Sequence, residues 1–169
     1  MILGYQDPDI DDLECESPTL STTSRTLIFM LAANQKWKLK SGDVKTAFMQ
    51  GDEEQRLIYG EVPDDVRDML GLRDDEIVRL KKAGYGLVNA PWKWFKKVEE
   101  TLLGLGWKQH PLGVCLFMKY NENDELVGVM GVHVDDVLTC GYGKEYLDDL
   151  QTISRKFKWG HWHEDDFTY

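Results

Sequence analysis

The sequence predicts a single domain of the α+β class. Two stretches, 91–106 and 146–157, repeat apolar residues with the 3.6-residue period of a helix, whereas 113–120 and 125–134 resemble two strands joined by a polar turn. No internal repeat, linker or low-complexity segment divides the chain. With 169 residues, 42% of them hydrophobic, the chain is long enough to bury one core of ordinary size, which excludes a disordered tail.

The first half of the chain contains one predicted helix and several short strands. Pro18 and the apolar residues that follow it predict a helix over 18 to about 34. Alternating lysines and apolar residues predict a strand over 36–40, with Trp37 and Leu39 on one face, that runs toward Asp43. Three further elements are predicted: strands over 57–62 and 76–80, and a turn of helix over 66–70 that ends at Gly71.

The second half contains the clearest periodicity. Pro91 begins a helix whose apolar face consists of Trp94, Phe95, Val98, Leu102 and Leu105. The polar tetrad 121–124 suits a turn between two strands, and 137–140 predicts a third strand. A last amphipathic helix covers 146–157, and the aromatic-rich segment 158–169 has no clear period.

Composition limits the class of protein. The longest apolar runs span seven residues, short of the ~20 that a membrane helix needs, and no basic-then-apolar leader opens the chain. Three widely spaced cysteines without a Cys-x-x-Cys motif argue against a disulfide framework and a zinc knuckle. We therefore expect an intracellular protein, cytoplasmic or nuclear and not secreted, with reduced thiols and no membrane partner.

The charge is unevenly distributed. The net charge of −10 opposes simple nucleic-acid binding, and acids dominate 7–16 and 61–76. Between Arg79 and Lys97, however, six positive charges occur without an acid, interleaved with Tyr85, Trp92 and Trp94. Such a stretch suits a phosphate backbone with stacked bases, and a solvated helix face explains the lysines equally well.

One of the six Asp-Asp pairs stands in an unusual place. Asp135 and Asp136 lie between two apolar strands, where two crowded carboxylates are unfavourable unless a cation neutralises them. A hairpin tip whose aspartates simply face water explains the same pair equally well. Asp43, at the end of a predicted strand, strengthens the metal interpretation, although taken alone it reads as a helix N-cap. A further metal site is conceivable at His161 and His163, which are followed by Glu164-Asp165-Asp166, but no Cys or third His lies nearby in sequence.

Three blocks of the sequence resemble successive motifs of the reverse transcriptases of copia-type retrotransposons. The blocks are Asp43-Val44-Lys45-Thr46-Ala47-Phe48 with Gly51-Asp52, Leu80-Lys81-Lys82 with Tyr85-Gly86-Leu87 and Ala90-Pro91, and Val134-Asp135-Asp136. Their order and spacing also match. The resemblance implies the palm of such an enzyme, an antiparallel sheet backed by helices.

The resemblance also implies roles for particular residues. Asp43, Asp135 and Asp136 resemble the catalytic carboxylates that hold two Mg²⁺ or Mn²⁺ ions for nucleotidyl transfer. Phe48 resembles the gate that excludes a ribonucleotide 2′-hydroxyl, and Tyr85, Gly86 and Pro91 belong to the loop against the incoming nucleotide. The implied partners are an RNA or DNA template-primer and deoxynucleotides.

The sequence departs from the family pattern at several positions. His133 stands where tyrosine is usual, Gly42 replaces an apolar residue, and Ala83-Gly84 and Trp92 are also atypical. The chain resembles a truncated domain: 1–35 as a fingers remnant and helix, 36–157 as the palm, and 158–169 as the start of the primer-grip region. Within these 169 residues we expect neither a thumb nor a ribonuclease H.

Three functions remain open at this point. The first is an RNA-directed DNA polymerase, favoured by the three carboxylates. The second is a catalytically inactive or repurposed palm that acts as a structural or protein-interaction module, favoured by the net charge and the acidic segments. The third is a metal-binding module without polymerase activity.

Overall fold

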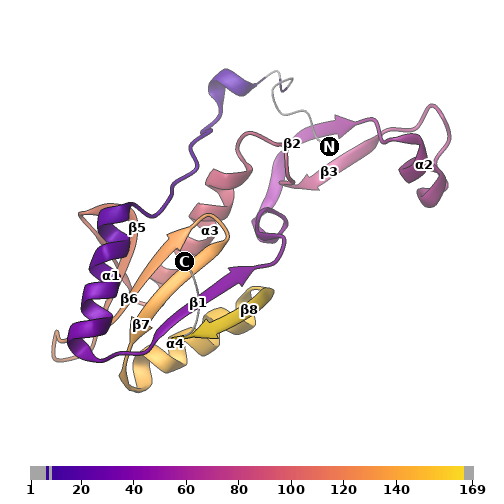
Figure 1. The fold of residues 1–169 in the computed structure, drawn as a ribbon. Helices are drawn as coiled ribbons and strands as arrows, with labels where there is room; N and C mark the ends of the chain where they lie inside the picture. Colours follow the sequence, from indigo (N-terminus) through magenta and orange to yellow (C-terminus); the bar gives the residue numbers. More distant parts are fainter. Residues whose placement is uncertain (1–6, 8, 166–169) are drawn as a thin grey trace.

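A six-stranded antiparallel sheet forms the centre of the molecule. The computed structural model describes residues 7 and 9–165. The strand order is β4-β5-β6-β7-β1-β8, and all neighbouring strands are antiparallel (Figure 1). Its strands are β1 (Leu39–Val44), β4 (Lys108–His110), β5 (Gly113–Tyr120), β6 (Leu126–His133), β7 (Asp136–Gly141) and β8 (Trp159–Glu164). The predicted α+β class is therefore confirmed.

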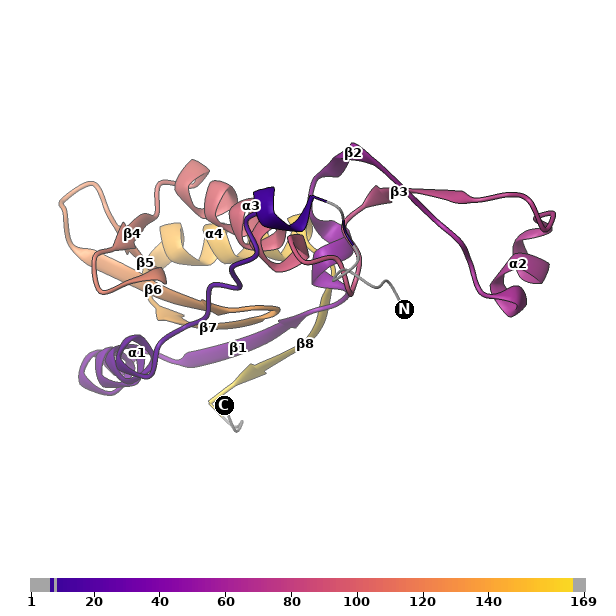
Figure 2. The ribbon, with the colours of Figure 1, turned by 90° about the horizontal axis from the view of Figure 1, so that it is seen from above.

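Helices cover both faces of this sheet. Helix α1 (Thr22–Gln35) lies on one face, and α3 (Ala90–Gly104) and α4 (Gly143–Lys156) lie on the other (Figure 2). Glycines let the helices approach closely: a Cβ on Gly131 would lie 2.8 Å from Ile28 of α1, and one on Gly128 would lie 2.7 Å from the Tyr146 ring of α4. Any larger residue would push a helix away from the sheet.

The core between α3, α4 and the sheet is rich in aromatic side chains. Trp94, Trp107, Tyr146 and Phe117 are the largest of its fully buried side chains. The polar atoms among them have partners, since Trp107 Nε1 donates to Asp149 (2.8 Å) and the Tyr146 hydroxyl lies 3.2 Å from the Thr139 hydroxyl. Buried hydrogen bonds of this kind fix the packing of α4 on the sheet.

A second, smaller unit projects from one end of the sheet. Strands β2 (Glu53–Gly60) and β3 (Val78–Lys82) form a separate two-stranded ribbon, and the short helix α2 (Asp64–Leu70) lies at its far end (Figures 1 and 2). We call residues 53–82 the arm. Its inner face packs on a small cluster formed by Ala83, Leu87 and Ala90, whereas α2 buries none of its residues. The arm therefore depends on its base for support.

The observed boundaries correct two predicted ones. The first helix begins at Thr22 instead of Pro18, because the Ser21 hydroxyl caps it by accepting from the Ser24 amide (3.1 Å). The first strand begins at Leu39, because Lys36 adopts a left-handed conformation (φ 55°) that ends α1 and leaves Trp37 before the strand. Within the described residues, no helix is long and apolar enough to cross a membrane.

Candidate active site

The sheet brings the three predicted carboxylates to neighbouring positions. Asp43, near the end of β1, is the register partner of Asp136 at the start of β7, and Asp136 is also opposite His133 on β6. Asp135 lies in the turn that joins β6 to β7. Asp43 lies within a strand, so its alternative as a helix N-cap is wrong: the following 3₁₀ turn η3 (Ala47–Gln50) is preceded by Thr46.

Two hydrogen bonds hold the β6–β7 turn in place. Val134 has a left-handed backbone (φ 59°), which is unfavourable for a β-branched residue and costs about 1–3 kcal/mol. The buried Trp94 side chain on α3 donates from Nε1 to the Val134 carbonyl (2.7 Å), and the Val44 amide donates to the Asp135 carbonyl (2.8 Å). Both neighbouring elements thus fix the turn that presents the aspartates.

Strand β8 packs closely against the first aspartate. A Cβ on Gly160 would lie only 2.5 Å from Oδ2 of Asp43, so no side chain fits there without moving that carboxylate. On the other side of β1, the rings of Trp159 and Trp162 occupy the space beside Gly42. A Cβ on Gly42 would lie 3.0 Å from the Trp159 ring and 2.9 Å from the Trp162 ring. The two glycines therefore let β8 lie directly beside Asp43.

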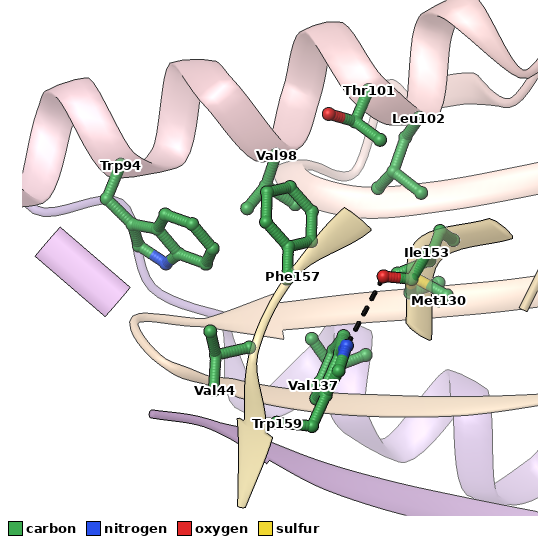
Figure 3. Close-up of a pocket in the computed structure, with 10 residues that line it drawn as sticks. All are labelled: Val44, Trp94, Val98, Thr101, Leu102, Met130, Val137, Ile153, Phe157 and Trp159. Atoms are coloured by element: carbon green, nitrogen blue, oxygen red, sulfur yellow. Dashed lines mark hydrogen bonds between the residues drawn. The ribbon is translucent and has the colours of Figure 1, made fainter. Parts of the chain in front are cut away.

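The inner side of these strands rests on apolar core. Figure 3 shows a small pocket lined by residues of β1, β6, β7, α3, α4 and β8. Val44 and Val137, which follow Asp43 and Asp136 in sequence, line it together with Trp94 and Phe157. Since successive side chains of a strand point to opposite faces, the carboxylates face away from this core. The apolar interior thereby fixes the strands while the acids remain accessible.

The three carboxylates are electrostatically coupled. Burial raises the pKa of Asp136, the charges of Asp135 and Asp43 raise it further, and His133 opposes the shift. A cation between such carboxylates would relieve their repulsion, and oxygen donors of this kind suit Mg²⁺ or Mn²⁺. Among the described residues, no group of three or more His, Cys, Asp or Glu side chains is already arranged to hold a metal ion.

The predicted nucleotide-binding residues form a second group at the base of the arm. Phe48, on η3, lies with its ring centroid 4.8 Å from that of Tyr85. Phe48 also packs against the cluster of Ala83, Leu87 and Ala90, so it is partly a core residue, whereas the Tyr85 side chain is 53% exposed. Gly86 has a positive φ (105°), and Pro91 lies in the first turn of α3, as its position in the sequence predicts.

The predicted basic stretch divides into two parts. The three lysines of α3 each have an acidic partner: Lys93 pairs with Glu54 (2.7 Å), Lys96 with Glu99 and Lys97 with Asp52. The charges of these lysines are therefore already paired within the protein. By contrast, Arg79, Lys81 and Lys82 on β3 are exposed and form no ion pair with the described residues.

Sequence reasoning missed Glu54, which anchors the arm. Its side chain is almost fully buried, and it contacts Lys93 of α3 and Arg56 Nε (3.5 Å). Burial alone would raise the pKa of Glu54, but the hydrogen bond from Lys93 and the nearby charges hold it below the ordinary value. Arg56 in turn forms a bidentate pair with Asp7 (3.0 Å for each bond). The sequence of 53–60 does not alternate between polar and apolar residues, so it carries no local signal for this role.

Sequence reasoning also missed Trp94 and Gly160 as supports of the carboxylates, because their partners are distant in sequence. Near His161 and His163, Glu164 pairs with Lys38 and with Lys40 (3.0 Å), and among the described residues these histidines belong to no group of three or more potential metal ligands. The cysteines are free thiols, with Cys15 exposed and Cys115 and Cys140 buried.

Comparisons with known proteins agree with the motifs. A family model described as reverse transcriptase (RNA-dependent DNA polymerase) matches residues 2–164. The chain is 32% identical over 157 residues to the retrovirus-related Pol polyprotein from transposon RE2 of Arabidopsis thaliana, covering 91% of this chain and 10% of the relative. It is 31% identical over 160 residues to the corresponding polyprotein from transposon TNT 1-94 of Nicotiana tabacum, covering 93% and 12%.

A more distant relative is the transposon Ty1-BL Gag-Pol polyprotein of Saccharomyces cerevisiae, at 23% identity over 176 residues, 92% of this chain and 10% of the relative. The chain thus spans about a tenth of the length of these relatives. No solved structure matches it.

Proposed function

Because the chain belongs to the reverse transcriptases of copia-type retrotransposons, we propose that it adds deoxynucleotides to a primer on an RNA template. The observation that carries this proposal is the pairing of Asp43 with Asp136, next to Asp135 in the adjoining turn. The three carboxylates would hold two Mg²⁺ or Mn²⁺ ions, which supply charge neutralisation for phosphoryl transfer when bound. In this proposal the sheet is the polymerase palm.

The chain's own contribution is to position these groups. Trp94 and the Val44 amide hold the turn that carries Asp135, and the missing side chain at Gly160 leaves room for the Asp43 carboxylate. Fixed placement of reacting groups is a main source of rate enhancement when the chemistry is phosphoryl transfer. Replacing Asp43 with Asn should therefore weaken Mn²⁺ binding.

Phe48 and Tyr85 form the proposed nucleotide side of the site. Their rings contact each other at the base of the arm, and Gly86 supplies a backbone that other residues rarely adopt. We assign to Phe48 the exclusion of a ribose 2′-hydroxyl, and to Tyr85, Gly86 and Pro91 the contact with the incoming nucleotide. The partners of the site are then a template-primer, with RNA or DNA as the template, and deoxynucleotides.

One observation favours a second candidate function, a protein-interaction module. The tip of the arm exposes Met69 (86%) and Leu70 (60%) on a helix that buries nothing. Both arginines near the tip interact within the arm. Arg67 donates to the carbonyl oxygens of Arg73 (2.7 Å) and Glu76 (3.1 Å). Arg73 forms ion pairs with Asp75 and Glu76. The other acidic side chains of the tip would then attract a basic partner protein; they are Glu61, Asp64, Asp65, Asp68 and Asp74.

Primer extension separates the two candidates. The parent chain, Asp135→Asn and Asp148→Asn would be incubated with an RNA template, a DNA primer, deoxynucleotides and Mg²⁺ or Mn²⁺. Asp148 belongs to another Asp-Asp pair and is exposed on α4, so it controls for the loss of one negative charge. Polymerase function requires extension by the parent and by Asp148→Asn and none by Asp135→Asn. Absence of extension by the parent would leave the interaction module as the better candidate.

A further inference from the structure

The chain between Asp43 and Phe48 contains a strained turn. Asp43 lies near the end of β1, and Phe48 follows on η3. Between them, Thr46 adopts a left-handed backbone (φ 48°), which is unfavourable for a β-branched residue. Such a conformation persists only where the surrounding structure holds it. The groups that hold this turn therefore determine how Phe48 lies relative to Asp43.

The side chain of Gln50 fastens this turn to the segment that enters β8. Its Nε2 donates to the carbonyl oxygens of Lys45 (2.6 Å) and Lys158 (3.0 Å). Its Oε1 accepts from the Lys158 amide (2.7 Å), and the Lys45 amide donates to the Lys158 carbonyl (3.0 Å). One carboxamide thus uses both its nitrogen and its oxygen to join two parts of the chain that are 108 positions apart.

The two parts joined by Gln50 belong to the two sides of the candidate site. The turn leads to Phe48, whose ring contacts Tyr85. The other part leads to Gly160, which lies directly against the Asp43 carboxylate. Phe48 is half-buried against the apolar base of the arm, and apolar packing is non-directional. The directional contacts that fix η3 relative to β8 are therefore those of Gln50.

We propose that Gln50 is a positioning residue for nucleotide selection, because its three hydrogen bonds hold Phe48 where the ring meets a ribose 2′-hydroxyl. The inference rests on the proposed function, in which Phe48 excludes ribonucleotides. Exclusion by contact is sensitive to displacements of about 1 Å. Replacement of Gln50 should therefore admit ribonucleotides while leaving all three carboxylates in the chain.

Single-nucleotide primer extension with dATP and with ATP tests the inference, on an RNA template whose next base is uracil. The variants are Gln50→Ala and Gln50→Glu; the second keeps an oxygen for the Lys158 amide and loses the N–H donors. The control is Gln151→Ala, which changes the same residue type at an exposed position of α4. The measured quantity is the ratio of kcat/KM for dATP to kcat/KM for ATP.

Both Gln50 variants should lower this ratio about tenfold, and Gln151→Ala should keep the ratio of the parent. Partial unfolding lowers the active fraction, which reduces both rates by the same factor and leaves the ratio unchanged. A merely structural role of Gln50 therefore does not produce the expected result. If Gln50→Ala does not fold, Gln50→Glu provides the same comparison.

The outcomes distinguish this inference from the proposed function. Extension by the parent with an unchanged ratio in the Gln50 variants would overturn the inference and leave the polymerase function standing. If the parent extends no primer, calorimetric titration of dATP and of ATP with template-primer and Mn²⁺ replaces the kinetic ratio. A preference for dATP that the parent shows and the Gln50 variants lose would then support the inference without polymerase activity. Equal affinity of the parent for both nucleotides, or binding of neither, would overturn it.

Discussion

Gly160→Ala tests the closest contact in the candidate site. The new methyl group would lie 2.5 Å from Oδ2 of Asp43, well inside normal contact distance, and 3.4 Å from the Asp43 carbonyl oxygen, which is acceptable. Either β8 moves away from β1 or the Asp43 carboxylate rotates. Overpacking of a closed core costs about 1–3 kcal/mol, but Asp43 is exposed and its carboxylate can rotate, so we expect the free energy of unfolding in urea to fall by about 1 kcal/mol.

The same substitution should weaken metal binding. Substitution of a residue that orients a metal-binding carboxylate without itself binding the metal typically lowers metal affinity by a factor of about ten or more. If Asp43 binds metal as proposed, we expect Mn²⁺ titrations to show about tenfold weaker binding. Gly60→Ala is the matched control, because Gly60 is also a strand glycine and a Cβ there meets nothing within 4 Å. Its stability should stay within about 0.5 kcal/mol of the parent.

A double-mutant cycle identifies the cause. In a chain that already carries Asp43→Ala, the atom that the methyl group meets is absent, so Gly160→Ala should cost less in that background. Equal destabilisation in both backgrounds would show that the carboxylate contact is not responsible. Unchanged stability and unchanged Mn²⁺ affinity of Gly160→Ala would refute the reasoning as a whole.

Three further predictions concern the supports of the site. Trp94→Phe removes the hydrogen bond to the Val134 carbonyl (2.7 Å) and should lower the free energy of unfolding in urea by about 1–3 kcal/mol; an unchanged value would mean that water replaces the indole. The pKa of Asp136 is raised in the folded state, so ionisation of this carboxyl lowers the free energy of unfolding as the pH rises above the ordinary value of 3.8. Without metal, Asp136→Asn should therefore be more stable than the parent at pH 7 and should lose this advantage at pH 3. Glu54→Gln leaves the partly buried Lys93 ammonium without its counter-charge and should cost about 1–3 kcal/mol in thermal unfolding, whereas Asp52→Asn, which breaks a more exposed pair, should cost less than about 1 kcal/mol; equal losses would contradict the anchoring role.

The sequence predicted well those elements whose partners are close along the chain. Helix α3 begins near Pro91 because its apolar stripe and helix-start proline are local signals. The β5–β6 hairpin was likewise recognisable from two strand-like apolar segments and the polar turn at 121–124. Local sequence signals therefore predict these elements, whereas the β6–β7 turn that carries Asp135 is held by contacts with Trp94 and Val44, which are distant in sequence.

The sequence did not predict the elements whose structure depends on distant residues. Strand β8 has no clear period, because its glycine and tryptophans are placed by contacts with β1. The pairing of the predicted lysine-rich strand with β7 and β8 was equally inaccessible to periodicity. The roles of Trp94 and Gly160 follow only from three-dimensional contacts, although the carboxylates that they support could be named from their motifs.

The position of β1 in the sheet also determines when the site can form during synthesis. Its only strand neighbours among the described residues are β7 and β8, which follow it late in the chain, and a hydrogen bond of 2.8 Å joins Leu39 to Asp165, 126 positions away. At ribosomal rates of about 5–20 residues per second, β1 would wait about 6–25 s for its last partner. Asp43 must therefore remain outside a completed sheet while the helices and the β5–β6 hairpin are already able to fold. Newly made chains should consequently acquire helical structure well before Asp43 and Asp136 are brought together.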